Sequence, residues 1–294
     1  MILEWRCVIP EGPELAYSRD RIKKLIESKS LTDLAVGLSG RYVKSPPQGL
    51  QDFVSDTKRL GSPRVDSVAT HGKFMWWCLT IPGLEEEWYM HCTYGMSGGW
   101  YVNPSKHTAF VVEYSGSGVP ITRDTDKLFF NDPRHFGTIK FVKGRDAHAK
   151  KLKTLGPCIL TTHMTPDLFA QKVLSKPTRT IAEALMDQST VAGVGNYLKA
   201  EILFDVGISP WRQVTDVSAE EYVKLCSSVL RIASESYKSQ GATISTYRTP
   251  DGDRGTTQFD FKVYSMKFCP AGHEVHREET PEGRTSHWCP VCQK

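Results

Sequence analysis

The sequence has no apolar run of the roughly 18 residues that a membrane-spanning helix requires. Its first residues include Glu4 and Arg6 and therefore make a poor secretory hydrophobic segment. Internal repeats and low-complexity tracts are also missing. These absences argue against a membrane partner and predict a soluble, intracellular protein, nuclear in a eukaryote and cytoplasmic or virus-associated otherwise.

A disulfide framework is missing as well. Five of the eight cysteines lie far apart in the sequence, and the other three crowd its C-terminus. The separated cysteines are Cys7, Cys78, Cys92, Cys158 and Cys226, and the terminal ones are Cys269, Cys289 and Cys292. Reduced thiols plus one metal site suit this distribution better than disulfide bonds do.

No strong excess of one charge is present. The net charge of +4 is compatible with nucleic-acid binding but does not demand it, because many basic proteins bind no nucleic acid. With 294 residues, of which 39% are hydrophobic, the chain is long enough for two modest domains plus an appendage.

The patterning predicts an α+β multidomain protein. Apolar residues repeat at helical spacing from Pro13 to Ser28, and short alternating segments separated by turn residues then predict an antiparallel sandwich. The expected strands are 65–80, 87–92, 110–114, 127–131 and 138–142.

After about Gly144 the pattern becomes helical. Thr165 is expected to cap a helix that has Pro166 at its first position. Ser218 and Glu221 form a capping box before a longer helix that Gly241 ends. The run 246–257 is expected to be a mobile loop.

The C-terminus carries four potential metal ligands in two pairs. Cys269 and His273 are followed, after fifteen residues, by Cys289 and Cys292. Short loops of this kind present thiolate and imidazole groups to tetrahedral zinc, and four protein ligands leave no open position for water. We therefore expect one structural Zn²⁺ in a finger with three cysteines and one histidine. Two other histidines, His276 and His287, remain rival ligands.

Six further motifs occur in a fixed order along the chain. They are Pro10-Glu11-Gly12-Pro13-Glu14, His71-Gly72-Lys73, Gly95-Met96-Ser97-Gly98, the run Asn131 to Gly137, Leu185-Met186-Asp187-Gln188, and the run Ala192 to Tyr197. Together with the finger, this set resembles the Fpg/Nei (formamidopyrimidine-DNA glycosylase / endonuclease VIII-like) family from Pro10 to Gln293. The finger itself looks most like the endonuclease VIII-like 2 branch.

The resemblance implies a catalytic β-sandwich domain at 10–144, a helix-two-turns-helix domain at 145–262 and a zinc finger at 263–294, after an extension at 1–9. Damaged DNA, in duplex, bubble or single-stranded form, would lie in the cleft of a monomer. Gly193 and Gly195 would bring backbone amides near Asn196 to a phosphate.

The resemblance also assigns roles to single residues. Pro10 would attack C1′ of the damaged nucleoside as a secondary amine and form a Schiff base, with Glu11 assisting sugar-ring opening. Lys73, Asn196, His107 with Lys106, and Arg284 would contact phosphates, and Arg284 would also aid the second elimination. Lys73 would aid proton transfer, and Glu14 is a supporting carboxylate.

Extrusion of a base leaves a hole in the stack that side chains must fill. The resemblance implies that Met96, Arg134 and Phe136 fill it, and Arg134 is also a DNA contact. Taken alone, Met96 and Phe136 could equally be core residues, and Lys73 could be an edge-strand charge.

The expected function is a bifunctional DNA glycosylase/AP lyase for oxidised bases, which uses no redox or nucleotide cofactor. One feature of the sequence conflicts with this function. Pro10 follows nine residues, and an acylated proline nitrogen has no usable lone pair for nucleophilic attack. A catalytically silent binder of damaged or abasic DNA is therefore an alternative. An unrelated zinc-ribbon interaction protein is a third hypothesis, which leaves Lys73 and the glycine-rich motifs unexplained.

Overall fold

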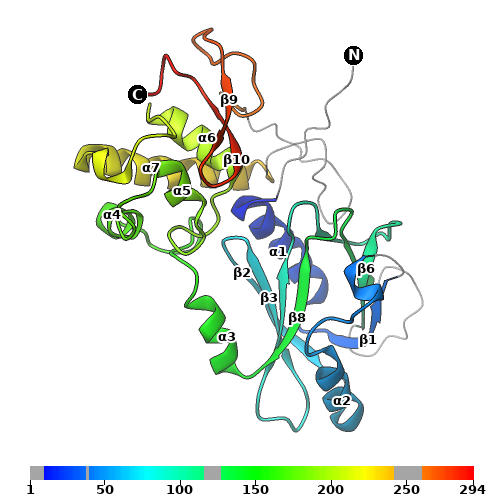
Figure 1. Cartoon of the computed structure of the whole chain (residues 1–294). Helices are drawn as coiled ribbons and strands as arrows, with labels where there is room; N and C mark the ends of the chain where they lie inside the picture. The colour runs from blue at the N-terminus through cyan, green and yellow to red at the C-terminus, as the bar shows by residue number, and fades with distance from the viewer. Residues whose placement is uncertain (1–9, 38–39, 116–126, 242–259) are drawn as a thin grey trace.

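A computed structural model describes residues 10–37, 40–115, 127–241 and 260–294 of the chain. The proposed extension 1–9 and the expected loop 246–257 lie outside these residues. The described chain forms a lower, mostly β body and an upper helical body that carries a small β-hairpin (Figure 1). Among the described residues, no helix has the length and apolar character to cross a membrane.

Helix α1 (Gly12–Ile26) opens the lower body, close to the helix expected from Pro13 to Ser28. Leu15, Ile22 and Ile26 lie on its buried face at helical spacing. At its start, the Glu14 carboxylate accepts a hydrogen bond of 2.9 Å from the backbone N–H of Glu11. The acidic side chain thus satisfies a donor that the helix itself cannot.

Eight antiparallel strands form the sheet of the lower body, in the order β5-β7-β6-β1-β2-β3-β4-β8. The strands are β1 (Ser30–Val36), β2 (Arg64–His71), β3 (Phe74–Thr80), β4 (Trp88–Thr93), β5 (Gly99–Tyr101), β6 (Thr108–Ser115), β7 (Lys127–Asn131) and β8 (Thr138–Lys143). Strands β1 and β2 share one residue pair, Ser30 with Arg64. The sheet therefore divides there into two four-stranded halves.

The two halves pack face to face through aromatic side chains. Trp77 of β3 lies against Trp100 of β5, with ring centres 4.9 Å apart. Phe110 of β6 meets Phe141 of β8 at 6.2 Å. This packing confirms the expected antiparallel sandwich.

Several elements differ from the sequence-based expectation. The single strand expected at 65–80 is wrong, because Gly72 adopts a positive φ of 58° and turns the chain between β2 and β3. Strands β1 and β5 and helix α2 (Leu50–Leu60) were not expected. Strand β5 has three residues, which is too short to show an alternating pattern.

The upper body contains helices α4 (Pro166–Val173), α5 (Ile181–Met186), α6 (Asn196–Asp205) and α7 (Ala219–Lys238), and α3 (Arg145–Leu152) leads into it. Both expected caps are confirmed. Thr165 accepts from the N–H of Leu168, and the capping box of Ser218 and Glu221 starts α7.

The finger contains the hairpin of β9 (His276–Thr280) and β10 (Arg284–Trp288), and residues on either side of this hairpin share the hydrophobic core of the helical body. Val263, Tyr264, Cys269 and Cys289 belong to the same buried cluster as Tyr197. The finger is therefore packed onto α6, and its orientation follows that helix.

Candidate active site and metal centre

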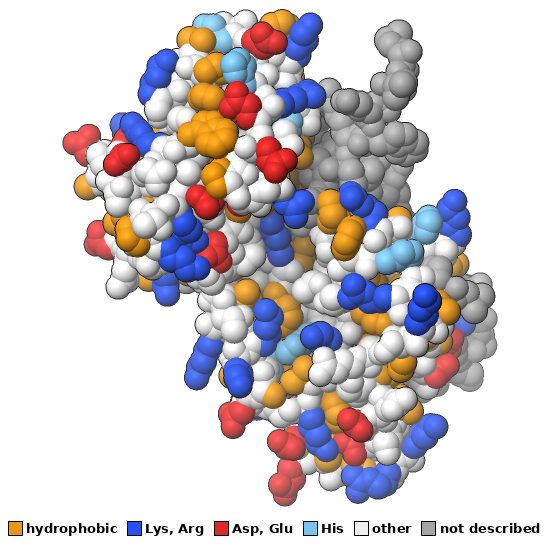
Figure 2. All heavy atoms as spheres, viewed as in Figure 1, with side chains coloured by type: hydrophobic (Ala, Val, Ile, Leu, Met, Phe, Trp, Pro, Cys, Tyr) orange, Lys and Arg blue, Asp and Glu red, His pale blue; other side chains and the backbone are white. Residues whose placement is uncertain are grey.

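A pocket of about 280 Å³ lies where the two bodies meet. Its lining comes from the start of the described chain, the β2–β3 turn, the end of β4, α3 and the segment after α5: Pro10, Leu15, Lys73, Phe74, Thr93, Tyr94, Gly95, Lys151, Leu155 and Gln188. Lys and Arg side chains lie on both bodies beside their junction, which we call the waist (Figure 2). Two of the expected catalytic residues, Pro10 and Lys73, thus share one pocket.

The carboxylate of Glu11 occupies the N-terminus of α6. It accepts hydrogen bonds from the backbone N–H groups of Gly195 at 2.7 Å and Tyr197 at 2.9 Å, with a longer one from Leu198 at 3.3 Å. A helix N-terminus attracts negative charge because its first N–H groups have no helical partner. These amides were expected to approach a phosphate, but the structure gives them to Glu11.

This contact requires glycine at position 195. A Cβ there would lie 2.2 Å from Cδ of Glu11 and 2.5 Å from Nζ of Lys73, so any side chain would displace both. Gly193, with φ 116°, accepts a backbone hydrogen bond from Gly12 at 2.9 Å. The Gly193–Gly195 turn therefore sets the distance between α1 and α6.

Gln188 braces the same turn from the other side. Its Nε2 donates to the carbonyl of Val194 at 2.9 Å, and its Oε1 accepts from the N–H of Gly193 at 2.9 Å. The sequence motif that ends in Gln188 was noted without a role for this amide, and the structure shows that it supports the glycine turn.

Burial and charge tune the groups that face the pocket. Burial raises the pKa of Glu11 to about 7, against the opposing charge of Lys73. Burial also lowers the pKa of Lys73, although Glu11 and Glu14 counteract this shift. Each group is thereby closer to its neutral form than it would be in water.

Glu14 supports the site from within α1. Besides the N–H of Glu11, it accepts a hydrogen bond from the Tyr197 hydroxyl at 2.9 Å. That hydroxyl lies 2.9 Å from Oγ of Ser236 in α7. Glu14 therefore links α1 to α6, and the Tyr197 hydroxyl continues the connection to α7.

Asn196 and Arg284 lie on facing elements. Nδ2 of Asn196 donates to the carbonyl oxygen of Thr285 at 2.9 Å, next in sequence to Arg284. Arg284 is exposed at the start of β10, and its charge contributes to the lowered pKa of Lys73. The structure thus brings Asn196 against the segment that carries Arg284, and Arg284 within electrostatic reach of Lys73.

The three expected void-filling residues come from two touching loops of the sandwich. The N–H of Arg134 donates to Oγ of Ser97 at 3.2 Å, and Ser97 follows Met96 directly. The guanidinium of Arg134 lies 5.7 Å from the ring centre of Phe136, whose side chain is 53% exposed. This exposure argues against a core position for Phe136, and Met96 is half-buried.

His107 precedes β6 beside these loops. Its carbonyl oxygen accepts a hydrogen bond of 2.9 Å from the N–H of Asp132, and Asp132 in turn accepts from the N–H of Gly137 at 2.7 Å. Asp132 thus anchors the Arg134 loop and ties it to His107. Lys106 is exposed next to it.

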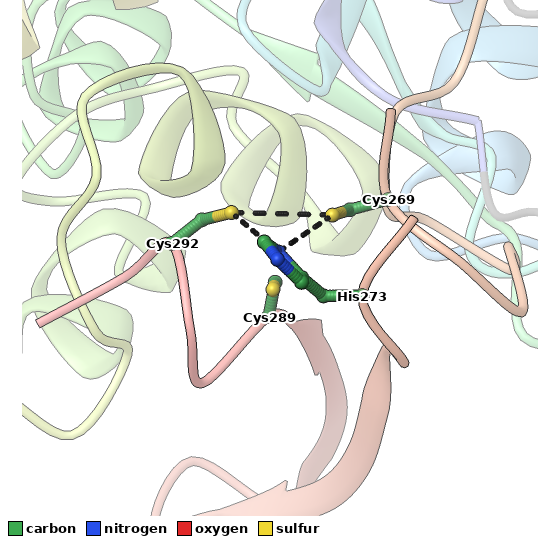
Figure 3. Close-up of side chains that lie close together, drawn as sticks. All are labelled: Cys269, His273, Cys289 and Cys292. Atoms are coloured by element: carbon green, nitrogen blue, oxygen red, sulfur yellow. Dashed lines mark hydrogen bonds between the residues drawn. The ribbon is translucent and has the colours of Figure 1, made fainter. Parts of the chain in front are cut away.

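Cys269, His273, Cys289 and Cys292 converge in the finger, with all four ligand atoms within 4.8 Å of one another (Figure 3). Sγ of Cys292 lies 3.9 Å from Sγ of Cys269 and 3.3 Å from Nδ1 of His273. Bonds of about 2.0–2.3 Å to a tetrahedral ion would place ligands roughly 3.3–3.8 Å apart. The donor set and its spacing therefore fit one metal ion.

Both rival histidines lie outside this cluster. His276 pairs with Glu278 at 3.4 Å, and His287 faces the ring of Tyr264 with ring centres 4.8 Å apart. Of the three histidines in the finger, His273 is the one that meets the cysteines.

One charged residue of the site was missed in the sequence. Lys199 of α6 is completely buried, and its Nζ lies 2.5 Å from Oε1 of Glu282 in the hairpin. A lysine between the apolar residues Leu198 and Ala200 was a signal that could have identified it, since buried lysine is rare unless paired.

Comparison with known proteins identifies related chains. The model of the formamidopyrimidine-DNA glycosylase N-terminal domain matches residues 9–139, and that of the formamidopyrimidine-DNA glycosylase H2TH domain matches residues 155–248. The formamidopyrimidine-DNA glycosylase of Shouchella clausii is 31% identical over 288 residues, which cover 97% of this chain and 99% of the relative. That of Zymomonas mobilis is 32% identical, with 97% and 100% covered.

Solved structures agree with these matches. The MutM (Fpg) protein of Thermus thermophilus has 29% identity and a TM-score of 0.78, over 97% of this chain and 98% of its own. A Lactococcus lactis Fpg variant, solved in complex with DNA containing Fapy-dG, has a TM-score of 0.80 at 23% identity, over 97% and 100%. At 23% identity, the likeness to the Lactococcus lactis protein shows a shared fold.

The raised pKa of Glu11 predicts a pH-dependent stability. The folded chain holds this proton at pH values where the unfolded chain, with a pKa of 4.5, has released it. The stability that protonated Glu11 contributes to the folded state is complete below pH 4.5 and is lost as pH rises through about 7. Over this window the wild-type free energy of unfolding should fall, relative to Glu11→Gln, by roughly 3 kcal/mol.

Urea unfolding of both proteins at a series of pH values measures this difference, in which titrating groups that do not interact with Glu11 cancel. Glu85→Gln, in an exposed turn, controls for the removal of one carboxylate. Parallel stability curves for the wild type and Glu11→Gln would contradict the assignment.

Proposed function

Because the chain belongs to the formamidopyrimidine-DNA glycosylase family, we propose that the pocket beside Pro10 is the active site of a DNA-repair enzyme. The protein is a base excision repair DNA glycosylase with an associated AP lyase activity, and its partner is damaged DNA. A single observation carries the proposal for the residues. Pro10 and Lys73 line one pocket, and the carboxylate of Glu11 and the amine of Lys73 both lie against Gly195.

The reaction needs an amine nucleophile and a proton donor. We propose that the free amine of an N-terminal Pro10 bonds to C1′, the bond from C1′ to the base breaks, and the base leaves with that electron pair and a proton. Glu11 supplies the proton that opens the sugar ring. Its pKa of about 7 supports this role, because such an acid holds a transferable proton at neutral pH.

Lys73 and Glu11 lie close together, since both would clash with a Cβ at Gly195, and the charge of each shifts the pKa of the other. Burial lowers the pKa of Lys73, which makes the ammonium group a readier proton donor and suits a residue that assists proton transfer. The alternative of a catalytically silent DNA binder is not favoured, because the relatives matched over their full length are glycosylases.

We propose that DNA lies across the waist between the two bodies. Lys73, Asn196, Arg284 and His107 would contact phosphates. Lys73 lines the pocket, Asn196 bonds the segment that carries Arg284, and His107 is tied to the loop of Arg134. Met96, Arg134 and Phe136 would enter the space that the extruded base leaves, because two touching loops present them together. Oxidised bases are the proposed substrates.

The proposed domains remain the catalytic sandwich at 10–144, the helix-two-turns-helix domain at 145–262 and the finger at 263–294.

The metal of the finger is proposed to be zinc. Three thiolates and one imidazole are ligands that zinc prefers, and four protein ligands indicate a structural role. The finger would hold Arg284 in place through the hairpin. Its single histidine supports a finer placement near the endonuclease VIII-like 2 branch.

We predict one zinc ion per chain, bound by Cys269, His273, Cys289 and Cys292. Cys292→Ala should lower the zinc content and weaken DNA binding, because the hairpin that carries Arg284 loses its anchor. Elemental analysis and binding titrations measure both effects, and Cys78→Ala, outside the cluster, serves as the control. Folded, active protein without zinc would refute the site.

Met96→Ala should slow the excision of a base from duplex DNA by about tenfold or more, because extrusion without a filler costs lost stacking. Processing of a pre-formed abasic site should change much less, since little extrusion is needed there. Single-turnover rates on the two substrates test this, with Met266→Ala as a matched control. Equal losses on both substrates would assign Met96 to packing.

A chain that begins at Pro10 should form a covalent complex with abasic DNA that borohydride traps. A chain in which Ile9 is joined to Pro10 should not trap through Pro10, because the acylated nitrogen has its lone pair delocalised into the carbonyl group. Trapping yields at pH 7 for the two forms measure the difference.

Peptide mapping provides the control. If the 294-residue form traps, the adduct should map to Lys73 or to the amine of Met1, and Lys73→Ala should distinguish the two. An adduct on Pro10 in the intact 294-residue chain would refute the requirement for a free Pro10 amine, and equal trapping by both forms at pH 7 would show that residues 1–9 do not matter.

A further inference from the structure

A buried ion pair joins α6 to the turn of the hairpin. Lys199 has no exposed surface, and the side chain of Glu282 is 11% exposed. Nζ of Lys199 lies 2.5 Å from Oε1 of Glu282. The hydroxyl of Thr280 lies within hydrogen-bonding distance of both Glu282 Oε1, at 2.8 Å, and the carbonyl oxygen of Arg284, at 2.9 Å.

These contacts flank Arg284 on both sides. Glu282 lies two residues before it, and the carbonyl of Thr285, one residue after it, accepts from Asn196. Asn196 and Lys199 are three residues apart in α6, so they lie on one face of the helix. That face therefore holds the segment Glu282–Thr285 at two points, with Arg284 between them.

The ion pair of Lys199 and Glu282 also interacts with other charged groups near the pocket, namely Glu11, Lys73 and Arg284. Burial lowers the pKa of Lys199, Glu282 and Glu11 raise it, and Arg284 lowers it further. The charges of Lys199 and Arg284 likewise lower the pKa of Lys73. Three cations thus lie within electrostatic reach of one another, and the carboxylate of Glu282 offsets their repulsion.

Stability alone does not account for such a pair. Two buried charges lose their hydration, and an apolar pair of the same shape is often as stable or more stable. A buried pair does, however, restrict geometry, because both partners must keep their contact or leave a charge uncompensated. Here the geometry that it restricts is that of the Arg284 backbone.

We propose that Lys199 and Glu282 are positioning residues for Arg284, which hold its guanidinium at the pocket without touching DNA themselves. This inference rests on the proposed function. In the second elimination at an abasic site, C4′ loses a proton, the bond from C5′ to oxygen breaks, and the phosphate leaves with the bonding electrons. A cation held beside that phosphate stabilises the charge that develops on it.

The test uses chains that begin at Pro10 and a duplex with one abasic site. Lys199→Met with Glu282→Gln removes both charges while it preserves side-chain volume, so we expect normal zinc content and a normal unfolding transition. The ratio of second-elimination to first-elimination product should fall by about tenfold or more, because small displacements of a catalytic group have large rate effects. The rate of the first elimination should change less than about threefold.

Arg284→Ala should lower the same ratio. Its addition to the double variant should cause little further loss, because the two changes would act through one group. The pair of Lys143 with Asp56 in the sandwich provides a matched control, and Lys143→Met with Asp56→Asn should leave the ratio unchanged.

An unchanged product ratio in the folded double variant would overturn the positioning role, as would an unchanged ratio in Arg284→Ala. If the double variant fails to bind zinc, Glu282→Asp carries the test, because it keeps the charge but shortens its reach. A ratio lowered by about threefold would then support the proposal, and an unchanged ratio would overturn it. Absence of any cleavage by the parent chain would instead contradict the proposed function.

Discussion

The carboxylate of Glu11 at the N-terminus of α6 is the contact on which the arrangement of the site depends. One side chain from the beginning of α1 satisfies backbone N–H groups of a helix 184 residues further along the chain. The negative charge complements the helix N-terminus, and burial keeps the contact away from competing water. It joins the sandwich to the helical body at the pocket itself.

This contact requires glycine at positions where the two bodies meet. Gly195 leaves room for Glu11 and Lys73, and Gly72 turns the chain against Ala192, where a Cβ would lie 2.6 Å from the carbonyl carbon. Backbone therefore comes close to backbone at this interface, and the Glu11 side chain bonds across it. The same closeness explains the electrostatics, because a carboxylate and an ammonium group buried at such an interface both move toward their neutral forms.

The finger extends this arrangement to the other side of the pocket. Its cysteines share the core of α6 and α7, and its hairpin is held by Asn196 and Lys199. Helix α6 thus contacts Glu11 with its first turn and the finger with one of its faces. Helix α6 therefore sets the position of Arg284 in the finger relative to Pro10, the proposed nucleophile, and Glu11, the proposed acid.

Local patterns in the sequence were sufficient for the caps at Thr165 and Ser218, the strand 127–131 and the ligand spacing of the finger, because these depend on neighbouring residues. They did not reveal the turn at Gly72, the short strand β5 or the partner of Lys199. Those features depend on contacts between segments far apart in the chain. The N–H groups of α6 received Glu11 rather than an external anion because folding brings α1 against them, and that outcome is a property of the tertiary structure alone.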